Sequence, residues 1–242
     1  MDLSTTDVAI LCGGLGTRLR SVLRDRPKPM ATIEGTPFLV LLAEHLAARG
    51  FRRFVFCVGY KAEMIESHFA KADSACEYLF SRELTPLGTA GALREARDKL
   101  RSELVLVLNG DSFCPVDYPA MLTFHREQQA RATLAVAPME RAEEYGGVIV
   151  ADEGHVVAFE EKRRSSGQRH VNAGIYLFRK GVVEALSDQV PLSLERQVFP
   201  GLVGNGLFAF KVQGPLLDIG TPERYARAQA ELLALMARGG RR

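Results

Sequence analysis

Short apolar runs alternate with segments of helical periodicity through the first half of the chain, and this alternation restricts its fold more than any other feature. Runs rich in Val, Leu, Ile and Phe predict strands at 8–12, 54–59, 78–80, 104–109 and 132–137. Segments with helical spacing or capping residues predict helices at 37–49, 61–69, 89–99 and 117–129. Continuous apolar strands separated by helices are typical of a parallel sheet that helices cover on both faces.

The second half of the chain has a different pattern. Beyond residue 138, more closely spaced strands are predicted at 147–152, 155–160, 172–178, 208–212 and 215–220, with a charged loop at 162–170. Thr36 before Pro37 predicts the start of the first helix, and Thr221 before Pro222 predicts the start of the last. We therefore expect one α/β domain over 1–242, with a Rossmann-like, mixed and mostly parallel sheet and an antiparallel second half.

Charge and cysteine content narrow the classes of partner. The 31 Lys and Arg residues nearly balance the 29 Asp and Glu residues, so the formal net charge is only +2. This balance argues against nucleic acid or an anionic membrane as a partner, whereas a small anionic substrate needs only a few well-placed cations. The four cysteines form no C-x-x-C pair, which favours a reduced protein without disulfides or zinc. With no signal peptide and no apolar run near ~20 residues, we expect a soluble, cytoplasmic protein.

A glycine-rich segment, GGLGTRL (13–19), directly follows the first predicted strand. It lacks the Gly-Lys-Ser/Thr of a P-loop, and Leu19 stands where the dinucleotide-binding fingerprint has its third glycine. Unobstructed backbone N–H groups at the end of a strand form a nest that phosphate oxygens can approach closely. A tight turn would explain one or two of the glycines but not Arg18. We interpret the segment as a phosphate-binding loop.

A second basic motif, RPKPM (26–30), follows about ten residues after the glycine segment. The two prolines hold the backbone extended around Lys28 and reduce its freedom, which suits a cation that must point at one place. An isolated RPKP segment is more often a solvated loop. Behind a glycine nest that carries an arginine, it favours phosphate binding.

These two motifs, together with six further blocks in order along nearly the whole chain, resemble the sugar-1-phosphate nucleotidyltransferases. The further blocks are PLGTAGAL (86–93), LNGD (108–111), YGG (145–147), FEEK (159–162), NAGIY (172–176) and LLDIGTPERYARAQ (216–229). The short opening and the DIGTPERY block are similar to the D-glycero-α-D-manno-heptose 1-phosphate guanylyltransferase branch. Mannose-1-phosphate guanylyltransferases and uridylyltransferases for glucose or N-acetylmuramate 1-phosphate are near relatives of that branch.

The resemblance implies the nucleotidyltransferase fold, a nucleotide-binding half over 1–138 and a sugar-binding half over 139–242. It implies a Mg²⁺-dependent reaction in which an NTP, here GTP, gives its nucleoside monophosphate to a sugar 1-phosphate and releases pyrophosphate. The implied nucleotide-binding residues are Leu11, Gly13, Gly14, Gly16, Thr17, Arg18, Glu83 and Gly88. The implied sugar-phosphate-binding residues are Gly146, Glu161, Lys162 and Asn172.

The same resemblance implies that Arg18, Lys28 and Asp111 are catalytic. Arg18 would grip the leaving pyrophosphate with its planar guanidinium, and Lys28 would bridge the α-phosphate and the sugar phosphate. Asp111, at the end of the fourth predicted strand, and Asp218 would hold Mg²⁺, because carboxylates and phosphate oxygens suit this hard cation. The alternatives are a turn role for Asp111 and a surface or capping role for Asp218.

Glu83 bears on the choice of base. Thymidylyl- and uridylyltransferases of this group often have a glutamine at the matching position. An ionised carboxylate only accepts hydrogen bonds, and guanine presents two adjacent donors, N1–H and its exocyclic amine. Glu83 therefore favours GTP, unless its side chain points into solvent.

Two functions from other classes can be compared with the transferase function. A non-catalytic nucleotide-sugar sensor would be expected to lack Arg18, Lys28 or one of the aspartates, and none is missing. An NAD-dependent oxidoreductase would need an acidic residue after the second strand, where Gly59 and Tyr60 stand instead. The sugar is not determined by the sequence, and a homo-oligomer is compatible with it, so the oligomeric state stays open.

Overall fold

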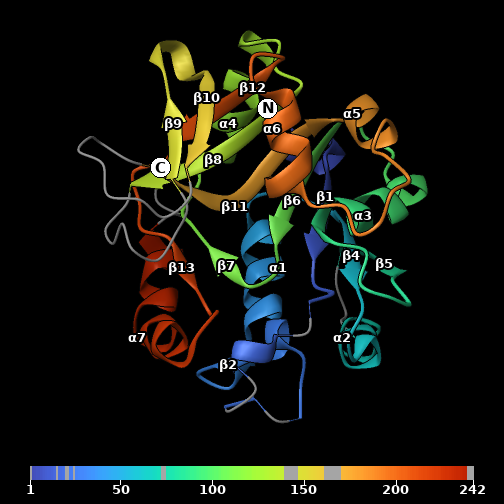
Figure 1. Cartoon of the computed structure of the whole chain (residues 1–242). Helices are drawn as coiled ribbons and strands as arrows, with labels where there is room; N and C mark the ends of the chain where they lie inside the picture. The colour runs from blue at the N-terminus through green and yellow to red at the C-terminus, as the bar shows by residue number, and fades with distance from the viewer. Residues whose placement is uncertain are drawn as a thin grey trace.

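The structure, a computed structural model, describes residues 2–14, 16–19, 22–23, 25–71, 75–138, 147–160 and 170–238. Within these residues the frame is a nine-stranded mixed sheet with the order β10-β9-β11-β6-β1-β4-β5, and β8 and β12 join it beside β11. Its strands are β1 Asp7–Leu11, β4 Arg53–Val58, β5 Glu77–Arg82, β6 Leu104–Asn109, β8 Ala132–Pro138, β9 Gly147–Val150, β10 Val156–Glu160, β11 His170–Arg179 and β12 Leu207–Lys211. Figure 1 shows β5 and the β9–β10 hairpin at opposite ends of the sheet.

The remaining elements are two short ribbons and the helices. One ribbon pairs β2 (Thr32–Ile33) with β3 (Thr36–Pro37), and the other pairs β7 (Ser112–Phe113) with β13 (Leu217–Asp218). The α-helices are α1 Phe38–Ala48, α2 Ala62–Phe69, α3 Thr89–Glu95, α4 Tyr118–Glu127, α5 Lys180–Glu184, α6 Phe199–Leu202 and α7 Pro222–Arg238. Among the described residues, no helix combines the length and the apolar character needed to cross a membrane.

The parallel half of the sheet is as predicted for four of its five strands. β1 pairs in parallel with both β4 and β6, and β4 pairs in parallel with β5. The predicted strand at 132–137 forms β8, but its neighbours are β11, which is antiparallel to it, and β12, which is parallel. β11 lies between β8 and β6 because each of its two edges forms an antiparallel ladder, and its ten residues are long enough to pair with β9 as well. The antiparallel second half is confirmed.

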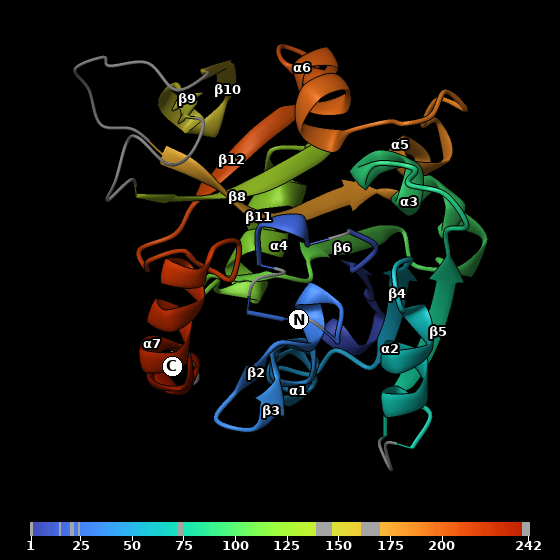
Figure 2. The same ribbon diagram turned by 60° about the horizontal axis from the view of Figure 1, so that its bottom comes forward.

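Helices cover both faces of the sheet, as predicted. One buried cluster contains Val8 and Ile10 of β1 with apolar residues of α1, α2, α4 and α7. The other contains Ala9 of β1 with apolar residues of α3, α5 and α6. Alternate residues of one strand therefore face opposite cores, as the two-residue period of a strand requires. Figure 2, turned from the first view, shows α1 and α2 below the sheet and α3, α5 and α6 above it.

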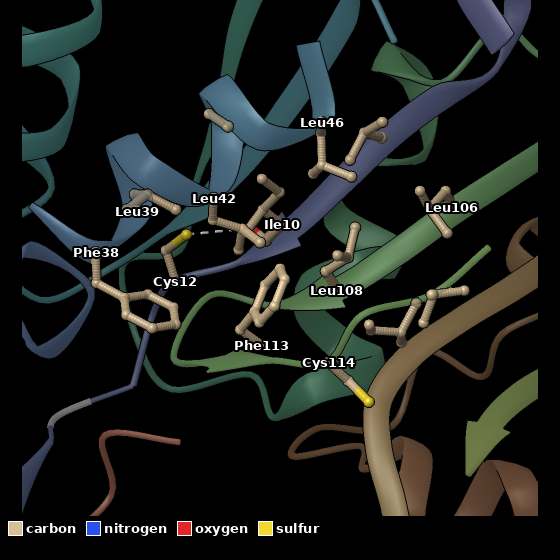
Figure 3. Close-up of a cluster of buried hydrophobic side chains, with 14 of the residues drawn as sticks. Ile10, Cys12, Phe38, Leu39, Leu42, Leu46, Leu106, Leu108, Phe113 and Cys114 are labelled. Carbon is tan, nitrogen blue, oxygen red and sulfur yellow. Dashed lines mark hydrogen bonds between the residues drawn. The ribbon is translucent and has the colours of Figure 1, made fainter. Parts of the chain in front are cut away.

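Figure 3 shows why the first helix is stable against the sheet. Three leucines of α1 pack over Ile10 of β1, beside Leu108 of β6, and each is at most 1% exposed: Leu39, Leu42 and Leu46. Spacing of three and four residues puts the leucines on one face of the helix. Burying each such side chain stabilises the fold by about 1.5–3 kcal/mol. This core lies directly beneath the point where β1 and β6 end.

Two predicted helix boundaries are wrong. The first helix begins at Phe38, because Thr36 and Pro37 are extended and pair with the preceding ribbon strand. The Phe38 N–H then donates to the Ala31 carbonyl oxygen, so no side chain caps this end. The helix predicted over 89–99 is divided, with α3 followed by a separate 3₁₀ turn at Arg97–Lys99. The predicted charged loop lies outside the described residues except for His170, which begins β11.

Candidate active site

A cavity of about 400 Å³ opens at the carboxyl ends of β1, β5 and β6. We name it the loop cavity, because the glycine segment after β1 and the segment after β5 form its walls. The residues predicted to bind nucleotide all line it: Leu11, Gly13, Gly14, Gly16, Thr17, Arg18, Glu83 and Gly88. The carboxyl ends of parallel strands are where α/β proteins commonly bind nucleotides.

Close packing explains two of the glycines in this loop. A Cβ at Gly13 would overlap the Glu83 carboxylate. Gly16 has a φ of +58°, and a Cβ there would lie 2.9 Å from the Lys28 Cβ. The glycine loop and the RPKP segment are thus packed directly together, and an L side chain at Gly16 would also strain the backbone.

Glu83 is half-buried and faces the loop cavity rather than extending into solvent. Its Oε2 accepts a hydrogen bond from the Leu87 N–H at 3.1 Å, and its Oε1 lies against Gly13 and Gly59. Burial raises the pKa of the Glu83 carboxyl, an effect that the Leu87 hydrogen bond opposes. The carboxylate is therefore held in one position, with oxygen lone pairs available at the cavity wall.

Lys28 and Asp111 form the ion pair at the centre of the site. The Lys28 Nζ lies 2.5 Å from the Asp111 Oδ2, with the two side chains 14% and 36% exposed. Lys28 begins a 3₁₀ turn between Pro27 and Pro29, both of which are buried. Asp111 follows β6 by two residues. The extended backbone expected around Lys28 is wrong at Lys28 itself, because Pro27 is extended but Lys28 already begins the turn.

A second cavity, of about 300 Å³, is also lined by this ion pair. We name it the ribbon cavity, because the β7–β13 ribbon contributes Ser112 and Asp218 to its wall. The residues that line both cavities are Arg18, Lys28, Asn109, Asp111 and Gly220. A group bound in one cavity would thus meet a group bound in the other at the Lys28 Nζ and the Asp111 carboxylate.

The ribbon explains how Asp218 comes close to Asp111 although 107 positions separate them. Asp218 pairs with Ser112 across the ribbon, and the Ile219 N–H donates to the Asp111 carbonyl oxygen at 3.0 Å. The Asp218 Oδ1 accepts the Gly220 N–H at 2.7 Å. The two-residue strand β7 was missed because so short a segment has no periodicity to detect.

Arg224 is a ribbon-cavity residue to which the sequence analysis assigned no role. Its guanidinium donates to both carboxylate oxygens of Asp218, at 3.3 and 3.2 Å. It occupies the first turn of α7, where the Thr221 Oγ1 accepts its backbone N–H at 3.3 Å. The capping residue Thr221 could have indicated Arg224, because the cap fixes where α7 begins and so places Arg224 in its first turn.

Asn172 also lines the ribbon cavity, at an irregularity in β11. Its Oδ1 accepts the Gly174 N–H at 2.9 Å, and its Nδ2 donates to the Tyr176 hydroxyl at 3.0 Å. Gly174 has a φ of +72°, and a Cβ there would lie 2.7 Å from the Asn109 Nδ2. Gly146, Glu161 and Lys162, the other predicted sugar-side residues, lie outside the described residues.

A buried polar network behind the site links the two cavities. Tyr176 is fully buried, and its hydroxyl donates to Glu195 at 3.4 Å. Glu195 accepts a hydrogen bond at 2.8 Å from Thr89, which lines the loop cavity. Burial, followed by the nearby Glu195 carboxylate, raises the pKa of Tyr176 well above its ordinary value. No sequence pattern indicates this network, since its members lie far apart in the chain.

Asp111 and Asp218 are the side chains that fit a divalent cation. Both line the ribbon cavity; Asp218 lies in β13, and Asp111 immediately precedes β7, the strand that pairs with β13. No cluster of three or more His, Cys, Asp or Glu side chains that could hold a metal occurs in the described ranges. Mg²⁺ is commonly bound through one or two carboxylates plus substrate phosphates, so two aspartates suit it.

A glycine loop at the end of a parallel strand, with Arg18, Lys28 and Asp111 on the wall common to two cavities, is typical of an enzyme that acts on nucleotide phosphates. The description of the matching family agrees with this class, because the nucleotidyl transferase family model matches residues 8–234. The chain belongs to the nucleotidyl transferase family, as its motifs predicted, and is an enzyme of that class.

The similar proteins match nearly the whole of this chain. The D-glycero-α-D-manno-heptose 1-phosphate guanylyltransferase of Aneurinibacillus thermoaerophilus is 37% identical over 93% of this chain and 98% of its own length. The mannose-1-phosphate guanylyltransferase of Mycobacterium tuberculosis is 33% identical over 94% of this chain and 64% of its own length. The crystal structure of HddC from Yersinia pseudotuberculosis complexed with GMP-PN is 33% identical, with a TM-score of 0.82 over 94% of this chain and 99% of that one.

Proposed function

We propose that this protein transfers the guanylyl group of GTP to D-glycero-α-D-manno-heptose 1-phosphate, with Mg²⁺ as cofactor, and forms GDP-heptose. The name of the Aneurinibacillus relative and the GMP-PN complex of the Yersinia protein support the nucleotide and the sugar. In this reaction a phosphate oxygen of the sugar 1-phosphate attacks the α-phosphorus of GTP in line. The bond from that phosphorus to the pyrophosphate oxygen breaks, and pyrophosphate leaves with the electron pair.

The single observation that carries this proposal is the Lys28–Asp111 pair on the wall common to both cavities. With the nucleotide in the loop cavity and the sugar phosphate in the ribbon cavity, the two reacting phosphates meet at the Lys28 Nζ. Their mutual repulsion is the main obstacle to reaction, so holding them in line beside a cation supplies most of the rate. This division also supports 1–138 as the nucleotide-binding half and 139–242 as the sugar-binding half.

Each cation has a separate role in the proposed mechanism. Lys28 neutralises the α-phosphate and the attacking phosphate oxygen, and its pairing with Asp111 keeps the ammonium in place. Arg18 lines both cavities, and its planar guanidinium suits the departing pyrophosphate. Mg²⁺, when bound by Asp111 and Asp218, supplies further positive charge to the phosphate oxygens.

The proposed preference for GTP rests on Glu83. Its carboxylate is held in the loop cavity between Gly13 and Gly59 and can accept both N1–H and the exocyclic amine of guanine. Uracil and thymine present one donor flanked by acceptors, which an ionised carboxylate repels. The Leu87 hydrogen bond orients the same carboxylate, so it has little freedom to turn away.

Pyrophosphate release with Mg²⁺ tests the proposal, with ATP, GTP, CTP, UTP and dTTP crossed against heptose, mannose, glucose and N-acetylmuramate 1-phosphates. We expect turnover with GTP and the heptose. Turnover with GTP and mannose 1-phosphate would instead favour the activity named for the Mycobacterium relative. Turnover with UTP or dTTP would overturn the role of Glu83. Nucleotide binding without turnover of any pair would favour a non-catalytic nucleotide-sugar sensor.

A further inference from the structure

The ribbon cavity has an unusual balance of charge for a site that must take a phosphate. The charged side chains that line it among the described residues are Arg18, Lys28, Arg224, Asp111 and Asp218. The two carboxylates repel the dianion of a sugar 1-phosphate, so the phosphate needs cations on its own side of the site. Arg18 and Lys28 also line the loop cavity, where the triphosphate requires them.

Arg224 differs from these two cations. Among the described cationic residues of the ribbon cavity, it is the one that does not also line the loop cavity. We propose that Arg224 binds the phosphate of the sugar 1-phosphate and that Asp218 holds its guanidinium in position. This inference rests on the proposed function, because it assigns the residue that binds the second substrate.

The geometry places Arg224 close to the reacting groups. A Cβ built on Gly220 would lie 3.7 Å from the Arg224 Nη1 and also 3.7 Å from the Lys28 Nζ. The two cationic nitrogens are therefore at most about 7.4 Å apart, beside Gly220, which lines both cavities. A phosphate that contacts both would have an oxygen near the Lys28 Nζ, where the attack on the α-phosphorus takes place.

The pairing with Asp218 restricts the arginine. The two side chains are only 21% and 12% exposed, and the Nη1 contacts both carboxylate oxygens. A guanidinium presents its five N–H donors in a planar fork that matches the oxygens of a phosphate. The Arg224 backbone N–H donates to the Thr221 Oγ1 in the first turn of α7, and this hydrogen bond fixes the position of the Arg224 backbone. Such restraint lowers the entropy lost when the phosphate binds.

The test is equilibrium binding, measured by calorimetry in EDTA so that Mg²⁺ makes no contribution. The ligands are D-glycero-α-D-manno-heptose 1-phosphate, mannose 1-phosphate and, separately, GTP. Arg224→Gln is expected to weaken binding of the sugar phosphate about 10- to 100-fold, the usual effect of losing a charge-assisted hydrogen bond, and to change GTP binding less than about 2-fold. Arg224→Lys is expected to restore part of the loss, because it keeps the charge but not the fork.

The matched control is Arg227→Gln, on the same helix. Arg227 pairs with Glu231 and lines neither cavity. This variant is expected to bind both ligands as the unchanged protein does. A melting curve for each variant separates loss of binding from loss of fold, and Arg224→Lys serves as the second variant if Arg224→Gln unfolds.

The possible outcomes separate this inference from the proposed function. Unchanged sugar-phosphate binding in Arg224→Gln, in a protein that turns over GTP and the heptose, would overturn the role of Arg224 and leave the function standing. Equal losses of GTP binding and of sugar-phosphate binding would also overturn the role of Arg224. They would indicate a general effect of the positive charge rather than a contact with the sugar phosphate. Failure of the unchanged protein to use any sugar 1-phosphate would overturn the function and the inference together.

Discussion

The two cavities that meet at Lys28 are built in different ways. The loop cavity is formed largely by backbone and glycines from two continuous segments, one after β1 and one after β5. The ribbon cavity is formed by single side chains, such as Asp111, Asn172, Asp218 and Arg224, that come from distant parts of the chain. Close approach of backbone suits a long phosphate chain, whereas separate charged side chains suit a compact phosphate on a variable sugar. Substitutions should therefore affect the two cavities in different ways.

The largest expected effect is at the wall between them. Lys28→Met removes the cation that faces both reacting phosphates in the proposed mechanism, and it removes the ion pair between Lys28 and Asp111. We expect kcat/KM for pyrophosphate release to fall by about 10³-fold, the scale seen when one preorganised transition-state donor is removed. GTP binding should fall far less, since Arg18 and the loop backbone remain.

The control for this variant is Lys180→Met. Lys180 pairs with Glu184 at 3.4 Å and lines neither cavity, so its loss should leave turnover unchanged. A Lys28→Met protein with near-normal kcat would show that the wall between the cavities is not where the reaction takes place.

A smaller effect is expected from a single methyl group in the loop cavity. Gly13→Ala places a Cβ where the Glu83 carboxylate lies, so either the loop or the carboxylate must move. A displacement of this kind costs about 10²-fold in kcat/KM when it shifts a bound substrate by roughly 1 Å. The loss should appear in KM for GTP, while binding of the sugar phosphate is retained.

Gly181→Ala is the matched control. Gly181 lies in α5, has no atom within 4 Å of an added Cβ and does not line either cavity. If Gly13→Ala weakened the sugar phosphate as much as GTP, the division into two independently built cavities would be wrong.

Acid sensitivity of the fold must be separated from acid sensitivity of the site. His125 is fully buried, and its Nδ1 lies 2.8 Å from the Thr133 Oγ1. Burial, aided by Arg179 and Arg126, lowers the pKa of His125 to about 4. Because the folded pKa is depressed, the unfolded chain binds more protons below about pH 6.5, and stability is lost as the pH falls from there toward 4.

At pH 5 this histidine is expected to cost on the order of 2 kcal/mol of unfolding free energy relative to pH 7.5. The expected result is that His125→Gln shows a smaller decrease in melting temperature between pH 7.5 and 5 than the unchanged protein. His68→Gln, at an exposed position of α2, serves as the control and should not alter the decrease. An unaltered decrease in His125→Gln would mean that other groups cause the acid sensitivity.

The sequence predicted the loop cavity better than the ribbon cavity, and the same difference in construction explains why. Gly13, Gly16 and Arg18 lie in one continuous segment after a strand whose apolar run is unambiguous, so a local pattern was enough. The four parallel strands and the two helical layers were predictable for the same reason. The LLDIGTPERYARAQ block identified Asp218 as a candidate. Its position close to Asp111, however, depends on the two-residue strand β7, which has no local sequence signal.

Contacts between distant residues set the limits of prediction elsewhere in the chain. The position of β8 depends on β11 entering between it and β6, which hydrophobic periodicity cannot show. Thr36 is a good cap by type, yet its pairing with Ile33 overrides that preference. The Tyr176–Glu195 contact joins two elements through buried polar groups, whose partners no spacing rule could identify.

The smallest predicted effect concerns selectivity within the loop cavity. Glu83→Gln keeps the size of the side chain but replaces one acceptor oxygen with a donor, so guanine loses one of its two hydrogen bonds. We expect the preference for GTP over UTP, measured as the ratio of kcat/KM values, to fall about 10-fold.

The pH dependence of kcat/KM gives a second readout of the role of Glu83. Burial raises the pKa of Glu83, so kcat/KM for GTP should fall as the pH decreases through that raised pKa, sooner than for an ordinary carboxyl. The glutamine variant should lack this decrease at pH values where the protein stays folded. Unchanged selectivity together with an unchanged pH profile would show that the base is recognised by the loop backbone alone, and the contrast between the cavities would then be sharper still.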